Sequence, residues 1–263
     1  MQALREVTMH TFDDVSRMMR GLNLKHSRES LSILLSQAGN QELTHLQWTG
    51  MLLGHELNER EQQRRSANRR KAGIQVEKHL DEFDYRHQTT ITKRQVAQLL
   101  DFQFIDNRQN LIFIGPPGVG KTHLATGIAL KALEQGYKVW FSTALALTEG
   151  LEMAEIKGRL KARIAQLCRY DLVVIDELGY LPMNRQNNHN LFQLIHALYE
   201  YRSVILTTNK DFTRWGDFFV DENVAVPIVD RLIHHAQIFM LGGESYRLRQ
   251  KMGGGSVGGV GQY

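Results

Sequence analysis

One eight-residue segment constrains the fold of this 263-residue chain more than any other feature. The segment runs from Gly115 to Thr122 with the letters GPPGVGKT, a complete match to the pattern G-x-x-x-x-G-K-[ST]. An apolar stretch, Leu111–Ile114, precedes it, and an amphipathic stretch, His123–Leu133, follows it. Because such a loop joins a strand to a helix, the sequence predicts a strand–loop–helix unit of an α/β fold.

The same segment predicts a nucleoside triphosphate site. Glycines let successive backbone N–H groups turn toward a phosphate, and the positive end of the following helix adds to that field. Lys121 is expected to bind the β- and γ-phosphates, and the Thr122 hydroxyl is expected to bind Mg²⁺. The predicted nucleotide-binding residues are Gly115, Pro116, Pro117, Gly118, Val119, Gly120, Lys121, Thr122 and His123.

Two further apolar stretches end in polar residues. Leu172–Ile175 runs into Asp176 and Glu177, and Val204–Thr207 runs toward Asn209. Because parallel strands bring their carboxyl ends to one edge of the sheet, these side chains are expected beside the phosphate loop. We expect Asp176 to orient Mg²⁺, Glu177 to polarise an attacking water, and Asn209 to hold that water and the γ-phosphate. A strand-end asparagine that merely begins a turn is the alternative for Asn209.

The choice between ATP and GTP depends on one position. Residues 176–179 (DELG) satisfy the D-x-x-G pattern of GTPases. The guanine-reading pattern N-K-x-D requires an acid at position 212, but residues 209–212 read NKDF, so the acid comes one position early. ATP is therefore favoured. The sequence contains no L-S-G-G-Q-like segment, which argues against a transporter-type ATPase.

The spacing of apolar residues divides the chain into four parts. Residues 1–80, which contain a capping box at Thr11, are predicted to form a helical domain. This domain is expected to bind DNA or a partner protein. Residues 81–91 are predicted to be a linker. Residues 92–250 alternate short apolar stretches with helical ones, and residues 251–263 form a glycine-rich flexible tail.

The apolar stretches of the third part predict its fold class. They are short and mostly non-alternating, which is typical of strands buried on both faces of a parallel sheet. Helical stretches separate them, so an α/β fold with a five-stranded parallel sheet covered on both faces is expected. The five expected strands are Leu111–Ile114, Lys138–Phe141, Leu172–Ile175, Val204–Thr207 and Ile238–Leu241.

A long helical segment that starts at Gln41 changes character along its length. Leu46, Leu53 and Leu57 fall on one stripe, which predicts that its first half is buried, whereas residues 58–71 are almost wholly polar. Its second half is therefore expected to be exposed.

Basic residues gather in two places, although the net charge is only +4, from 32 basic and 28 acidic residues. The first cluster comprises Arg60, Arg64, Arg65, Arg69, Arg70 and Lys71, and the second comprises Lys157, Arg159, Lys161 and Arg163. Each is a candidate for neutralising the phosphates of DNA. A solvated helix face is the alternative for both.

Composition limits the class of protein and the cellular compartment that can be expected. Hydrophobic residues are 42% and charged residues 23% of the chain, which excludes a disordered chain. No apolar run is long enough to cross a membrane, and the first residues lack the pattern of a signal peptide. The single cysteine, Cys168, has no second cysteine in the chain with which to form a disulfide. We therefore expect a cytoplasmic protein without membrane contact.

Together these motifs resemble the AAA+ ATPases, and more closely the IstB-type ATP-binding proteins of insertion sequences, relatives of the DnaC-type helicase loaders. The resemblance rests on Phe102–Ile105, Gly115–Thr122, Val173–Glu177, Thr207–Asn209, Ile228–Leu232 and Glu244–Arg247. It implies a three-layer AAA+ P-loop domain with a minimal or absent lid, preceded by a small all-α domain.

The resemblance implies catalytic roles for two arginines beside Lys121, Asp176 and Glu177. Arg231 matches the arginine finger, which reaches the γ-phosphate bound by a neighbouring subunit; a surface ion pair with the adjacent acid is the alternative. Arg247 matches a second sensor arginine that acts within its own subunit. The chain departs from the wider AAA+ pattern because no sizeable helical lid is expected after the last strand.

The resemblance also implies a function, a Mg²⁺-dependent, DNA-stimulated ATPase that regulates transposition. Such a protein binds duplex DNA, forms a homo-oligomer with ATP at subunit interfaces, and recruits and stimulates a partner transposase of the IstA type. Hydrolysis then disassembles the complex. The alternatives are a replicative helicase loader of the DnaC type and, from another class, a non-hydrolysing nucleotide-gated DNA-binding scaffold. The intact Glu177 argues against the scaffold.

Overall fold

The computed structural model describes residues 10–180, 183–219, 222–246 and 248–249. The chain divides into two compact units, Met1–Ala67 and Asn68–Tyr263. The expected glycine-rich tail, residues 251–263, lies outside the described residues. Among the described residues, no helix has both the length and the apolar character needed to cross a membrane.

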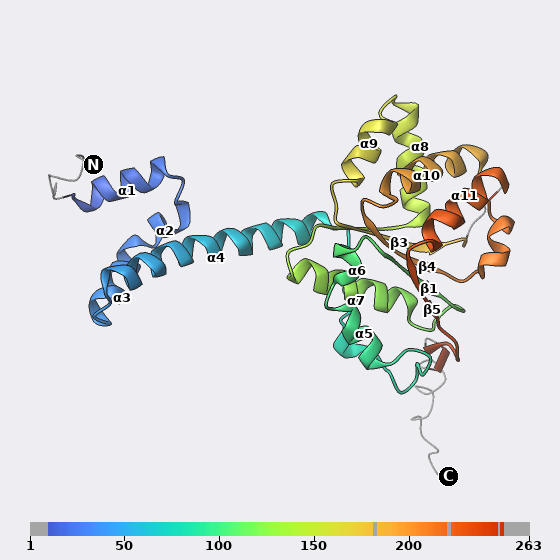
Figure 1. The fold of residues 1–263 in the computed structure, drawn as a ribbon, viewed down its shortest axis with the longest axis horizontal. Helices are drawn as coiled ribbons and strands as arrows, with labels where there is room; N and C mark the ends of the chain where they lie inside the picture. Colours follow the sequence, from blue (N-terminus) through green and yellow to red (C-terminus); the bar gives the residue numbers. More distant parts are fainter. Residues whose placement is uncertain (1–9, 181–182, 220–221, 247, 250–263) are drawn as a thin grey trace, which may run out of the picture. The chain divides into compact units, whose positions relative to one another are not determined.

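The first unit is helical, as the sequence predicts. It contains α1 (Phe12–Gly21), α2 (Lys25–Glu29), α3 (Leu31–Asn40) and most of α4 (His45–Lys71) (Figure 1). The predicted capping box begins α1. The Thr11 hydroxyl accepts the backbone N–H of Asp14 at 3.2 Å, and the Asp14 carboxylate accepts the backbone N–H of Thr11 at 3.1 Å.

A buried carboxylate on α4 ties this helix to α2. Glu56 accepts the backbone N–H of Ser27 at 2.8 Å and the Nε–H of Arg60 at 2.8 Å. Burial raises the pKa of Glu56, but these hydrogen bonds outweigh that effect and leave the pKa below its ordinary value. Glu56 therefore remains charged and anchors the helix.

The apolar stripe of α4 is not buried as the sequence predicts. Leu46 is 82% exposed and Leu57 is 66% exposed. The side of α4 that contacts α2 carries Glu56 instead. The three short helices α1, α2 and α3 provide too little surface to cover the 27-residue helix α4 on several sides.

The second unit is built on a parallel sheet with the strand order β2-β3-β4-β1-β5. The strands are β1 (Asn110–Ile114), β2 (Val139–Thr143), β3 (Leu172–Leu178), β4 (Ser203–Thr208) and β5 (Ala236–Met240). This arrangement confirms the predicted fold class and all five predicted strands. It also makes β3, β4 and β1 neighbours, and these are the strands that precede the acidic pair, Asn209 and the phosphate loop.

Helices cover both faces of the sheet, giving three layers (Figure 1). One face is covered by α5 (Lys93–Leu99), α6 (Gln103–Asp106) and α7 (Lys121–Glu134), and the other by α8 (Ala144–Ile156), α9 (Leu160–Leu167), α10 (Arg185–Leu198) and α11 (Glu222–Ile233). Two short 3₁₀ helices are η1 (Leu80–Glu82) and η2 (Phe212–Asp217). Alternate residues of β1 enter the two cores, with Phe113 on one side and Ile112 on the other. Burial on both faces explains the continuous apolar runs of β1, β3 and β4, whereas the edge strand β5 is partly exposed.

The boundary between the units falls earlier than the expected boundary at residue 80. Residues 73–91, which we call the strap, belong to the second unit together with the end of α4. Ala72, Leu80 and Phe83 are buried in the core beneath α7, and the backbone N–H of Phe141 donates to the Ala72 carbonyl at 2.7 Å. The predicted linker is therefore a packed segment of the second unit.

Gly127 on α7 allows this packing, and its substitution tests the packing. A Cβ at Gly127 would lie 2.6 Å from Leu80 Cδ2 and 3.2 Å from the Lys78 carbonyl oxygen, whereas a Cβ at Gly150 on α8 would meet nothing within 4 Å. Gly150→Ala should raise the free energy of unfolding by roughly 0.5–1 kcal/mol, because alanine favours helix. Gly127→Ala should lower the melting temperature measured by circular dichroism. Equal melting temperatures for the two variants would contradict the packing of the strap on α7.

Candidate functional site

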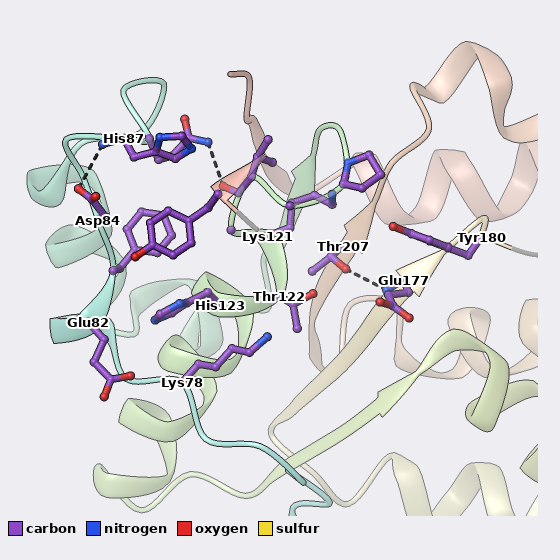
Figure 2. A pocket seen from close by; sticks show the side chains of 17 residues that line it. Lys78, Glu82, Asp84, His87, Lys121, Thr122, His123, Glu177, Tyr180 and Thr207 are labelled. Carbon is purple, nitrogen blue, oxygen red and sulfur yellow. Dashed lines mark hydrogen bonds between the residues drawn. The ribbon is translucent and has the colours of Figure 1, made fainter. Parts of the chain in front are cut away.

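A pocket of about 230 Å³ lies at the carboxyl end of β1 (Figure 2). Four parts of the second unit line it: the strap, the phosphate loop with the start of α7, the ends of β3 and β4, and the segment after β5. The lining residues are Lys78, Glu82, Phe83, Asp84, His87, Gln88, Pro117–His123, Glu177, Tyr180, Thr207 and Tyr246. The pocket therefore contains most of the predicted phosphate loop.

The phosphate loop needs glycine at two of its positions for geometric reasons. Gly118 and Gly120 have φ angles of +85° and +99°, in the left-handed region. A Cβ at Gly118 would lie 2.1 Å from Ser245 Oγ, and a Cβ at Gly120 would lie 2.6 Å from the Phe83 ring. The loop is thus held closely between the strap and the segment after β5.

Lys121 begins α7 and is largely buried. Its Nζ donates hydrogen bonds to the carbonyl oxygens of Gly115 at 2.7 Å and Pro116 at 2.8 Å. The ammonium group therefore lies against the loop that is predicted to bind phosphate. Phosphate oxygens, being charged, are stronger acceptors than these neutral carbonyls.

Thr122 and Asp176 meet at the edge of this loop. The Thr122 hydroxyl donates to Asp176 Oδ1 at 3.0 Å, and Asp176 is buried at the end of β3. The Thr207 hydroxyl on β4 donates to the same carboxylate oxygen. A hydroxyl and a carboxylate at the edge of a phosphate loop are oxygen ligands of the kind that Mg²⁺ prefers. These two residues therefore fit the predicted metal role.

Glu177 leaves the strand at an irregularity in the sheet. The pairing of β3 with β4 shifts register between Ile175 and Leu178, and Glu177 has a left-handed φ of +62°. Its backbone N–H donates to Thr207 Oγ1 at 2.9 Å (Figure 2). This bulge exposes the Glu177 carboxylate toward the pocket while both neighbouring residues stay buried. A non-glycine residue in this conformation costs about 1–3 kcal/mol, and such strain is concentrated at functional sites.

Asn209 follows β4, as predicted, but does not line this pocket. Its Oδ1 is buried and accepts no hydrogen bond from the described residues. A buried acceptor without a donor costs about 1–3 kcal/mol. This carbonyl oxygen could accept a hydrogen bond from a bound water, as the sequence analysis expects.

The strap forms a wall of the pocket that the sequence analysis missed. Gln88 is buried, and its Nε2 donates to the carbonyls of Val119 and Gly242, both at 3.0 Å. His87 Nε2 lies 2.9 Å from the carbonyl oxygen of Glu244. The strap thus joins the phosphate loop to the segment that follows β5.

Aromatic rings line the same wall. Phe83 packs edge-on against Tyr85 at 4.8 Å and against His123 at 5.3 Å, measured between ring centroids. The ring of His123, a predicted nucleotide-binding residue, is held by a contact of 2.7 Å between its Nε2 and the His79 carbonyl. Phe83 and Tyr85, two aromatic residues in a mostly polar part of the strap, were the feature of the sequence that could have indicated this wall.

Charged groups of the strap also face the pocket. The side chain of Lys78 reaches toward Thr122 (Figure 2) and forms no ion pair within the described part of the chain. The backbone N–H groups of His87 and Arg86 donate to the Asp84 carboxylate and hold its pKa below the ordinary value. The pocket therefore contains one cation that the predicted loop does not supply.

Arg231 lies at the opposite end of the sheet from this pocket. It lines a small cavity with Asn110, the first residue of β1, and Asn110 Nδ2 donates to the Leu232 carbonyl at 2.9 Å. The phosphate loop follows the other end of β1, about 17 Å away for five residues of strand. Arg231 forms no ion pair with Asp230 in the described structure.

The candidate Arg247 lies outside the described residues. The preceding residue, Tyr246, lines the pocket, and its backbone N–H donates to the Gly118 carbonyl at 3.1 Å. The Glu244–Arg247 motif therefore begins beside the phosphate loop.

Most members of the first basic cluster are paired with acids. Arg60 contacts Glu56, Arg64 and Arg65 contact Glu61, and Arg69 contacts Glu77. Arg70 and Lys71 are exposed and form no ion pair among the described residues. These last two side chains are the most available for an external phosphate.

The second basic cluster lies on α9 and the turn before it. Lys157, Arg159 and Arg163 border a groove of about 350 Å³ between α8 and α9. Arg163 is half-buried, with its guanidinium 5.5 Å from the centroid of the Trp140 ring. Lys157, Arg159 and Lys161 are exposed. Ile164 and Leu167 on the same helix are buried, as expected for an amphipathic helix.

The sequence of this chain matches a known protein family and several known proteins. Residues 18–254 match the family described as IstB-like ATP binding protein. The chain is 36% identical over 230 residues to a protein of Geobacillus stearothermophilus named as an ATP-binding protein of insertion sequence IS5376, covering 88% of this chain and 92% of the relative. A Pseudomonas aeruginosa protein named as an ATP-binding protein of insertion sequence IS21 is 38% identical, with 88% and 87% covered.

One solved structure shares the fold of the second unit. The crystal structure of DnaI superimposes with a TM-score of 0.52 over 62% of this chain and 90% of that chain, at 15% sequence identity. This likeness shows a common fold.

Gln88 offers a test of the strap as a wall of the site. Gln88→Glu replaces the donor to the carbonyls of Val119 and Gly242 with a carboxylate, which repels both oxygens. We expect the affinity for a fluorescent ATP analogue to fall at least about tenfold, in line with a loss of roughly 1–3 kcal/mol for unsatisfied buried groups. Gln98→Glu, an exposed residue on α5, makes the same charge change and should leave affinity unaltered. Equal affinities for both variants would show that the strap does not shape the site.

Proposed function

The chain belongs to the IstB-like ATP-binding family, and from this we propose that it is an AAA+ ATPase that regulates transposition of an insertion sequence. One observation carries the proposal: residues suited to bind phosphate, a metal ion and an attacking water lie at one end of the sheet, while Arg231 lies at the other end. The first set supports hydrolysis within a subunit, and the second supports completion of that site by a neighbour.

The residues at this end of the sheet divide the work of hydrolysis. The N–H groups of the phosphate loop and Lys121 bind the triphosphate. Thr122 and Asp176 would hold Mg²⁺, which neutralises phosphate charge when bound. Glu177, exposed beside the loop, polarises the attacking water. Asn209 Oδ1, which has no hydrogen-bond partner among the described residues, accepts a hydrogen bond from that water.

Arg231 acts on the nucleotide of a neighbouring subunit. Five residues of β1 separate it from the phosphate loop of its own chain, a distance that an arginine side chain does not span. A guanidinium supplied by a neighbour stabilises the charge that develops on the transferred phosphoryl group. Assembly into a homo-oligomer with ATP at the subunit interfaces is therefore part of the proposal, and loss of the γ-phosphate removes one reason for subunits to stay together.

Duplex DNA is the proposed scaffold of this assembly. Arg70 and Lys71 at the end of α4, and Lys157, Arg159 and Lys161 beside α9, are exposed cations suited to phosphate contacts. The paired arginines of α4 contribute less, because each already has an acidic partner.

The proposed partner is the IstA-type transposase of the same insertion sequence, which the ATP-bound assembly recruits and stimulates until hydrolysis disassembles the complex. The names of the relatives at 36% and 38% identity support this context. The likeness to DnaI, at 15% identity, concerns the fold and gives no support to helicase loading.

Glu177→Gln tests hydrolysis directly. The amide keeps the shape of the side chain but does not accept a proton, so ATP should bind with unchanged affinity while DNA-stimulated phosphate release falls by about 10²–10⁴-fold. Glu82→Gln, which makes the same charge change in the same pocket, should retain wild-type phosphate release. A Glu177→Gln protein that hydrolyses ATP at the wild-type rate would show that the base is another group. A wild-type protein that binds ATP without hydrolysing it would favour the scaffold.

Salt dependence tests the DNA contacts of α4. The double substitution Arg70→Gln and Lys71→Gln should weaken duplex binding and reduce the slope of log K against log salt by up to about 1.8, because each lost phosphate contact removes about 0.9. Lys93→Gln with Arg94→Gln removes two exposed charges from α5 and serves as the matched control. Fluorescence anisotropy across a salt series measures both. An equal slope in the two double variants would assign Arg70 and Lys71 to an ordinary solvated surface.

A further inference from the structure

Arg231 is surrounded by aromatic side chains between α10 and α11. Its guanidinium carbon lies 5.3 Å from the ring centroid of Phe192 and 6.0 Å from that of Tyr199. Its Nε donates to His196 Nδ1 at 3.3 Å. We call Phe192, His196 and Tyr199 the Arg231 cradle. The cation faces two aromatic rings, an arrangement that attracts a guanidinium through the negative faces of the rings.

The cradle is itself held in place. Phe192 and His196 lie one turn apart on α10, and their rings stack with centroids 6.0 Å apart. Tyr199, which follows the last residue of α10, has its hydroxyl hydrogen-bonded to His234 Nδ1 at 2.8 Å. The rings around Arg231 are thus fixed both along α10 and from the segment after α11.

The hydrogen bonds of Arg231 use two of the three nitrogens of its guanidinium. Of its five N–H groups, the Nε–H donates to His196, and NH1 donates to the Pro227 carbonyl at 3.0 Å. The other terminal nitrogen donates to no residue in the described part of the chain. A guanidinium fixed through two of its nitrogens, with N–H groups remaining on the third, can bind an external anion with little loss of side-chain freedom.

We propose that Phe192, His196 and Tyr199 are positioning residues that orient Arg231 toward the nucleotide of the neighbouring subunit. The inference rests on the proposed function, since it requires Arg231 to act on a neighbour. It predicts a result that would not be expected if these side chains only packed α10 on α11. Damage to the cradle must impair the site of the neighbouring subunit and leave the damaged subunit's own site competent.

Mixing two impaired proteins tests this prediction. Phe192→Leu keeps an apolar side chain of similar size but removes the ring face under Arg231, so hydrolysis by this variant alone should fall at least about tenfold. Glu177→Gln has a dead site but an intact Arg231. In an equimolar mixture, about a quarter of the interfaces pair a competent Phe192→Leu site with an intact Arg231, so phosphate release should rise well above either protein alone. Phe192→Tyr, which keeps the ring, should behave as wild type.

The mixture of Arg231→Ala with Glu177→Gln distinguishes the action of Arg231 on a neighbouring subunit from its orientation by the cradle. Recovery of phosphate release in this mixture supports action of Arg231 on a neighbour, and its failure, when both proteins bind ATP and assemble, overturns the proposed function and the cradle together. If this mixture recovers, two results overturn the cradle alone. One is wild-type hydrolysis by Phe192→Leu, and the other is no recovery when Phe192→Leu is mixed with Glu177→Gln.

Discussion

The hydroxyl of Thr207 organises the catalytic end of the sheet. It donates to the Asp176 carboxylate and accepts the backbone N–H of Glu177, so one side chain on β4 sets the position of both acids on β3. Two neighbouring carboxylates then face different surroundings. Asp176 is buried against Thr122, and Glu177 is turned out toward the pocket by the bulge. The different surroundings of the two acids follow from these two hydrogen bonds.

The strap connects the nucleotide pocket to the rest of the chain. It continues directly from α4, packs Leu80 and Phe83 beneath α7, and uses Gln88 to join the phosphate loop to the segment after β5. A ligand in this pocket would therefore contact a segment that leads, without a flexible linker, into the basic end of α4.

Local patterns located the phosphate loop and the strand ends beside the pocket. The loop at Gly115–Thr122 and the acids at the end of β3 were recognisable because chemistry and backbone geometry there are set by consecutive residues. Burial on both faces made β1, β3 and β4 continuous apolar runs. The edge strands β2 and β5 are less buried but were recognisable from their apolar residues as well. The exposed stripe of α4 and the packed strap were predicted incorrectly, because both depend on which distant surface is available to cover them.

The sequence by itself determined the strands and the phosphate loop, since each depends on residues that are adjacent in the chain. Only the tertiary structure decided that the strap walls the pocket, that Thr207 positions both acids, and that Arg231 lies at the far end of β1 within an aromatic cradle. These features join segments that are far apart in sequence. Their positions follow from strand order and from helix packing across the sheet, which no local pattern encodes.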